Sequence, residues 1–102
     1  MKKIKIEKTK ITKDQLLRDG DKKEVDYKDL MELTLDIVPR EGFTPKDIRD
    51  RNRIQNSIDK EKDGTVSLED ADFENFVTIL EGSRWPIRDK ELAAFLEKFD
   101  KK

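Results

Sequence analysis

Apolar residues recur along the first quarter of the chain at the spacing of a β-strand. In residues 2–12, Ile4 and Ile6 alternate with lysines and Ile11 follows after a gap, which predicts a strand with one buried face. Residues 24–27 have the composition of a second short strand. The Arg-Asp-Gly-Asp sequence of residues 18–21 is a turn signal, because glycine tolerates positive φ and aspartate bonds its own backbone. Together they predict an irregular β-hairpin.

The next two apolar segments have helical spacing. Residues 30–38 carry a wide apolar arc, with Asp29 as the expected N-cap and Pro39 beyond the end. A second helix is expected from Thr44, a good N-cap, and Pro45, which is favourable as the first helical residue. This second helix is so polar that it is expected to pack through a narrow stripe.

The last third of the chain repeats the change from strand to helix. Residues 65–68 alternate apolar and polar and predict a short strand, after which Asp70 or Asp72 is expected to cap a helix. Asp89 is expected to cap a final helix. The apolar stripes of these two helices are Phe73, Phe76, Val77 and Leu80 in the first, and Leu92, Phe95, Leu96 and Phe99 in the second.

These elements predict an α+β fold in a single domain spanning residues 1–102. A small β-hairpin or short sheet is expected to pack on about four short helices. Residues 1–28 would form the hairpin region, residues 29–100 the mainly helical part, and residues 101–102 a frayed tail. A chain of this length matches the usual size of a single hydrophobic core.

Composition narrows the classes of function. The chain has 23 basic and 24 acidic residues and a formal net charge of −1, so it lacks the basic excess expected of a nucleic-acid-binding domain. It contains no cysteine and no histidine, which removes thiolate chemistry, the commonest general base and the commonest transition-metal ligand. No spacing of carboxylates singles out a catalytic pair. We therefore expect a protein that is not an enzyme.

Residues 59–70 are similar to the calcium-binding loop of an EF-hand. Such a loop supplies oxygen ligands from positions 1, 3, 5, 7, 9 and 12 and has glycine at position 6. Gly64 stands at position 6, but position 3 is a glutamate, position 12 is an aspartate, and no second loop accompanies this one. The interpretations left open are a calcium site and a polar turn that leads into a helix. The candidate ligands are Asp59, Glu61, Asp63, Thr65, Ser67 and Asp70.

Three arginines in the second helix raise the question of nucleic-acid binding. At helical spacing Arg49 and Arg53 share a face, whereas Arg51 points elsewhere, and acidic residues are interspersed with them. With the balanced net charge, this pattern favours a solvated helix surface. Binding to nucleic acid is therefore not expected.

The order of several short motifs resembles a group of small uncharacterised tailed-phage and prophage proteins. The matching features are V-D-Y-K-D-L-M after the turn, E-G-F-T before the arginine-containing helix I-R-D-R-N-R-I, then V-S-L-E-D-A-D-F, and finally R-W-P-I before a short helix. The resemblance covers nearly the whole chain and includes no catalytic motif. It implies a phage origin and a role inside the infected bacterial cell through binding of phage or host proteins.

We therefore expect a non-enzymatic interaction protein, an assembly accessory or a modulator of a host component, in the cytoplasm of the bacterial host. No cofactor is expected under this interpretation, and the alternative is a calcium-binding module with a single EF-hand-like loop. The chain has no apolar run long enough to span a membrane. Trp85 could serve as a contact residue or fill the core. Candidate contact residues for a partner or for self-association are Phe43, Trp85, Phe95 and Phe99.

Overall fold

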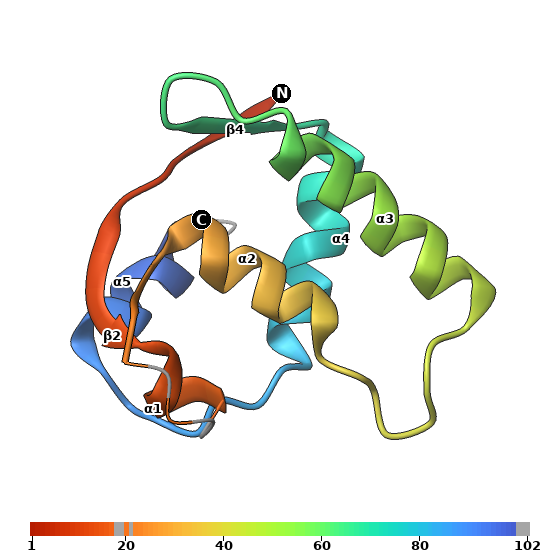
Figure 1. The fold of residues 1–102 in the computed structure, drawn as a ribbon. Coiled ribbons are helices and arrows are strands. Elements are labelled where there is room, and N and C mark those ends of the chain that lie inside the picture. The colour runs from red at the N-terminus through yellow and green to blue at the C-terminus, as the bar shows by residue number, and fades with distance from the viewer. Residues whose placement is uncertain (18–19, 21, 100–102) are drawn as a thin grey trace.

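The computed structural model describes residues 1–17, 20 and 22–99 (Figure 1). It confirms the predicted α+β class, with small antiparallel sheets and helices packed around one core. Most of the predicted turn at residues 18–21 and the predicted tail at residues 101–102 lie outside the described residues. No helix within the described ranges is long and apolar enough to cross a membrane. The elements are β1 (Lys2–Lys5), β2 (Lys8–Thr12), α1 (Lys13–Leu17), β3 (Glu24–Asp26), α2 (Tyr27–Asp36), α3 (Pro45–Asp59), β4 (Thr65–Leu68), α4 (Asp70–Glu81) and α5 (Lys90–Glu97).

The predicted N-terminal strand is two strands that belong to different sheets. β1 pairs antiparallel with β4, which lies more than sixty positions later in the chain, so that Ile4 lies opposite Val66 and both side chains are buried. β2 pairs antiparallel with β3. The predicted single hairpin is therefore wrong in its first half, because the apolar partner of Ile4 is on the distant strand β4.

The sheet of β2 and β3 has an irregular register. Lys8 pairs with Asp26 and Thr12 pairs with Glu24. Between these two pairs β2 contains more residues than β3, which is the mark of a β-bulge. The buried hydroxyl of Thr9 donates a hydrogen bond of 2.6 Å to the carbonyl of Val25 and accepts one of 3.2 Å from the Ile11 amide. The threonine side chain thus satisfies backbone groups that the bulge leaves without strand partners.

The helix starts were predicted with mixed success. Thr44 caps α3 in a reciprocal capping box with Asp47, and Asp89 caps α5, as predicted. The expected cap Asp29 is instead the third residue of a capping box whose N-cap is Asp26, so α2 begins at Tyr27 and ends before Val38. At α4 the N-cap position is Glu69, without a side-chain cap bond, and the expected caps Asp70 and Asp72 lie inside the first turn, where their charge suits the helix dipole.

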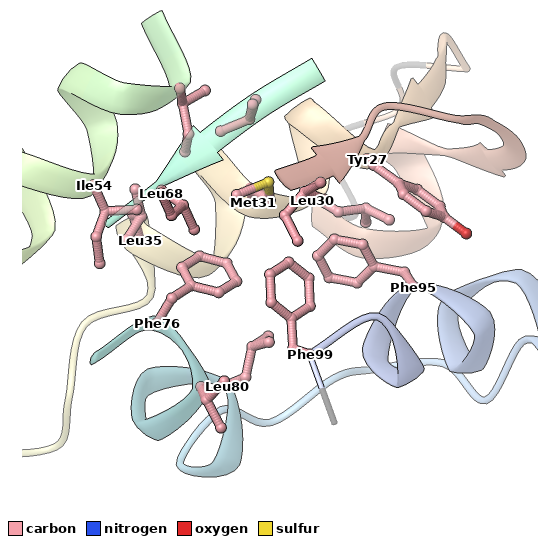
Figure 2. Packing of buried hydrophobic residues seen from close by; sticks show 14 of the residues in the cluster. Tyr27, Leu30, Met31, Leu35, Ile54, Leu68, Phe76, Leu80, Phe95 and Phe99 are labelled. Atoms are coloured by element: carbon pink, nitrogen blue, oxygen red, sulfur yellow. The ribbon is translucent and has the colours of Figure 1, made fainter. Parts of the chain in front are cut away.

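Aromatic side chains from α2, α4, α5 and the segment after α5 form the centre of the core (Figure 2). The ring of Phe99 lies 4.8 Å from Phe76 and 5.2 Å from Phe95, and Phe95 lies 5.2 Å from Tyr27, measured between centroids. Phe95 is fully buried and Phe99 is 3% exposed. The prediction that these two phenylalanines form a contact surface is therefore corrected, because their stripe packs against α2 and α4.

Candidate functional site

Within residues 59–70, the backbone of residues 62–65 forms a tight turn. Lys62 and Thr65 exchange two backbone hydrogen bonds of 3.0 Å, and the residues between them, Asp63 and Gly64, both have positive φ angles, 54° and 74°. Two central residues with positive φ define a type I′ turn, for which Asp-Gly is a favoured sequence. The Gly64 carbonyl also accepts a hydrogen bond of 2.8 Å from the amide of Ile6. The turn therefore sets the start of β4 and its alignment with the N-terminal segment.

The candidate calcium ligands of this segment have separate partners. Asp59 is the last residue of α3 and accepts a hydrogen bond of 2.9 Å from the side-chain amide of Gln55. The Glu61 carboxylate lies 3.7 Å from the Lys28 ammonium group, and the Asp70 carboxylate lies 3.2 Å from the N-terminal amine. Thr65 and Ser67 are in β4, and Asp63 is exposed in the turn. Among the described residues, no three carboxylates gather into a group that could hold a metal ion. The structure thus spreads these residues along a helix end, a turn and a strand.

Calcium titration tests the EF-hand interpretation directly. Because the carboxylates lie apart and the hairpin fixes the backbone, we expect calcium up to about 1 mM, the weak end of EF-hand affinities, to leave the amide NMR signal of Gly64 in place. Magnesium at the same concentration is the control for ionic strength. A saturable shift at Gly64 with calcium alone would restore the calcium-binding module as the leading function.

The three arginines of α3 have different surroundings. The Arg51 guanidinium reaches the end of α2, where one nitrogen lies within 2.8–3.3 Å of three backbone carbonyls, those of Thr34, Leu35 and Ile37. Arg53 lies 3.5 Å from the buried carboxylate of Asp72, and Arg49 is exposed. Two of the three charges are therefore used to join α3 to its neighbours in the fold.

An exposed apolar cluster lies around the connection between α2 and α3, which projects from one side of the molecule (Figure 1). Val38, Phe43 and Ile48 are 63%, 37% and 48% exposed, and we refer to these three residues as the Phe43 surface. Phe43 precedes the N-cap Thr44 and Ile48 is the fourth residue of α3, the two positions that form a hydrophobic staple. Of these three residues only Phe43 was predicted from the sequence as a contact residue. The apolar residues at N′ and N4 around the helix start at Thr44 are a signal that could have added Ile48.

Arg51 connects the parts of the Phe43 surface. Its guanidinium carbon lies 4.8 Å from the centroid of the Phe43 ring, and the nitrogen that donates to the carbonyls at the end of α2 lies 3.2 Å from the Ile37 carbonyl, next to Val38. Stacking on arginine restricts the phenylalanine ring without burying it. The exposed ring is therefore held in place by the same side chain that fixes the end of α2.

The other predicted contact residue, Trp85, is half-buried. Its ring packs against the core between α4 and α5, together with Ile87. The indole Nε1 is buried and has no hydrogen-bond partner among the described residues. Of the two interpretations of Trp85, the structure favours core packing, because the ring is covered on one side by the main cluster.

Three titratable groups have shifted pKa values, and they lie in three different places. Burial, followed by the nearby charges of Glu7 and Glu91, raises the pKa of Tyr27. Burial likewise raises the pKa of Glu32 on α2, with Asp29 and Asp59 adding to the shift and Lys28 opposing it. The capping bonds with Thr44 lower the pKa of Asp47. Each shift has a local structural cause, so these groups do not form one catalytic constellation.

A hollow of about 430 Å³ lies along the outer side of α2. Val25, Leu33 and Ile37 contribute its apolar lining, and Leu33 also packs against the core. The charged residues that line it are three acids of α2 and one lysine of α1: Asp29, Glu32, Asp36 and Lys13. We refer to these seven residues as the α2 hollow. Its volume falls within the roughly 300–1,000 Å³ usual for ligand pockets.

Comparison with known proteins adds no relative. No protein-family model matches the chain, and neither the curated proteins nor the solved structures give a significant match. The protein is a small α+β domain with an exposed apolar surface at the α2–α3 connection.

Proposed function

We propose that this protein is a non-enzymatic binding protein that contacts a partner protein through the Phe43 surface. The observation that carries the proposal is the exposure of three large apolar side chains at one connection in a chain with only 33% hydrophobic residues. In a chain with so few hydrophobic residues, burying these side chains would add to the stability of the core, whereas exposing them does not. Grouped exposed apolar residues commonly mark binding sites.

The arrangement of the Phe43 surface suits an interface anchor. Aromatic and arginine side chains are enriched among the residues that contribute most to protein–protein binding. Phe43 is stacked on Arg51 and precedes the capping box at the start of α3, so less conformational freedom remains to be lost on binding. These features support a preformed contact.

The size of the surface supports a partner protein over a stable dimer of this chain. Stable interfaces bury roughly 800 Å² on each side and involve about 20–30 residues. Three exposed apolar side chains provide the anchor of a small, transient interface instead. With the phage-protein resemblance, the proposed role is that of an assembly accessory or a modulator of a bacterial host component.

Comparative affinity capture tests this proposal. Wild-type protein, Phe43→Asp and the control Ala71→Asp are immobilised and exposed to the same bacterial extract, and bound proteins are quantified by mass spectrometry. Ala71 is exposed in the first turn of α4, so its substitution adds the same charge elsewhere. We expect a defined protein to be retained by wild type and Ala71→Asp and lost at least about tenfold with Phe43→Asp, because a charge replaces the anchor ring.

Two further measurements interpret that result. The affinity of the identified protein, purified, must fall in the same order among the three variants, and circular dichroism must show that Phe43→Asp retains its fold. Equal retention of every protein by the two aspartate variants would refute the proposal. Dimerisation of the wild type that Phe43→Asp abolishes would replace the foreign partner with a second copy of the chain.

A further inference from the structure

The α2 hollow combines an apolar lining with an unbalanced acidic rim. Three carboxylates and one ammonium group face the same space, which leaves an excess of two negative charges. None of the ion pairs found among the described residues includes Asp29, Glu32 or Asp36. The carboxylate of Asp29 has one hydrogen-bond donor, since one of its oxygens accepts a hydrogen bond of 3.1 Å from the backbone amide of Asp26. The nearby charge of Lys28 and a hydrogen bond from Gln55 favour the charged form of Glu32. The negative charge of the rim is therefore only partly compensated within the described fold.

Asp36 stands at the end of α2 that disfavours a negative charge. It is the last residue of α2, where the carbonyl ends of the helix already carry partial negative charge, and the last turn contains no basic residue. Its side chain is exposed beside the hollow. Arg51 already donates to the carbonyls at this helix end. An incoming positive charge would therefore gain mainly from pairing with the Asp36 carboxylate.

Leu33 of α2 and Ile37, the residue that follows the helix, both line the hollow and are only partly buried. Val25 of β3, which is 2% exposed, also lines the hollow. An apolar side chain inserted there would be removed from water on more than one side, while residues flanking it would meet the carboxylates of the rim.

From this geometry we infer that the α2 hollow binds an extended segment of a partner protein in which one apolar residue is flanked by lysine or arginine. The inference goes beyond the proposed function, because it assigns a second site with a different recognition chemistry. The apolar residue would provide most of the affinity, and the basic residues would provide selectivity and speed of association.

Selection from a displayed library of random twelve-residue peptides tests the inference. We expect enriched peptides to share an apolar residue with lysine or arginine on both sides. The strongest of them should shift the amide NMR signals of α2, and its affinity should fall as salt concentration rises, because screening weakens the rim charges. The Asp36→Lys variant should weaken the peptide at least tenfold.

The matched control for Asp36→Lys is Glu81→Lys. Glu81 is the last residue of α4, is exposed, and likewise lacks a basic residue in its turn, so both variants reverse one charge at a helix end. Lysine is favourable at that position, so neither variant is expected to unfold the protein. Glu81→Lys should leave peptide affinity unchanged, and Glu32→Gln should produce a smaller loss than Asp36→Lys.

Several outcomes would overturn the inference. They are the absence of any enriched peptide, enrichment of peptides without basic residues, and equal binding by Asp36→Lys and wild type. Concentration-dependent line broadening that Asp36→Lys removes would assign the hollow to a second copy of the chain. Peptide binding that Phe43→Asp abolishes and Asp36→Lys preserves would remove this site and leave the proposed function standing.

Discussion

Replacing Phe95 with alanine should lower the free energy of unfolding by about 3–5 kcal/mol, the usual cost of removing a large buried aromatic side chain. Phe95 has no exposed surface and its ring contacts those of Tyr27 and Phe99. The variant would leave a cavity between α2 and α5 that the rings around it cannot fill. Equilibrium unfolding in urea, monitored by circular dichroism, measures the loss.

The control for this prediction is Phe43→Ala, the same substitution at the exposed phenylalanine. Phe43 contacts Arg51 but lies outside the core, so its removal should cost less than about 1 kcal/mol. Similar destabilisation by the two variants would contradict both the core position of Phe95 and the assignment of Phe43 to a binding surface.

Replacing Arg51 with alanine should destabilise the protein by about 2–3 kcal/mol, because hydrogen bonds from a charged donor to partly buried carbonyls are among the stronger ones. The Arg51 guanidinium contacts the carbonyls of Thr34, Leu35 and Ile37 at the negative end of α2. Without it, these carbonyls lose their donor and α3 loses its link to α2. Thermal and urea unfolding both report this change.

Two variants separate the role of Arg51 from a simple effect of charge. Arg49→Ala removes an exposed arginine of the same helix and should change stability by less than about 0.5 kcal/mol. Arg51→Lys keeps the charge but lacks the planar fork, so it should recover only part of the lost stability. Full recovery with lysine would show that charge alone stabilises the end of α2.

The sequence identified part of the candidate binding surface and misplaced another part. Phe43 was predicted as a contact residue because a thin core was expected to leave some apolar side chains uncovered, and it is exposed. Phe95 was predicted as a contact residue for the same reason, but it is fully buried. Helical spacing shows that a stripe exists, but it does not show which other element covers it.

The same limit explains why the sequence left the calcium-loop interpretation of residues 59–70 open. Their acidic residues and Gly64 fit the spacing of a calcium loop, and the positive φ of glycine fits either a calcium loop or a hairpin. The direction of each carboxylate depends on Gln55, Lys28 and the N-terminal amine, which belong to distant parts of the chain or to the preceding helix. Spacing along the chain therefore could not decide whether the ligands meet.

Local sequence by itself determined the α+β class, four of the helices and two of the caps, Thr44 and Asp89, because these depend on contacts within a few residues. The tertiary structure alone decided that residues 2–12 divide between two sheets, since β1 finds its partner in β4. It also decided that Arg51 secures α2, that Phe95 is buried, and that α2 borders an acidic hollow. Each of these features depends on elements that are far apart in the sequence. The periodicity of apolar residues does not show which of those elements pack together.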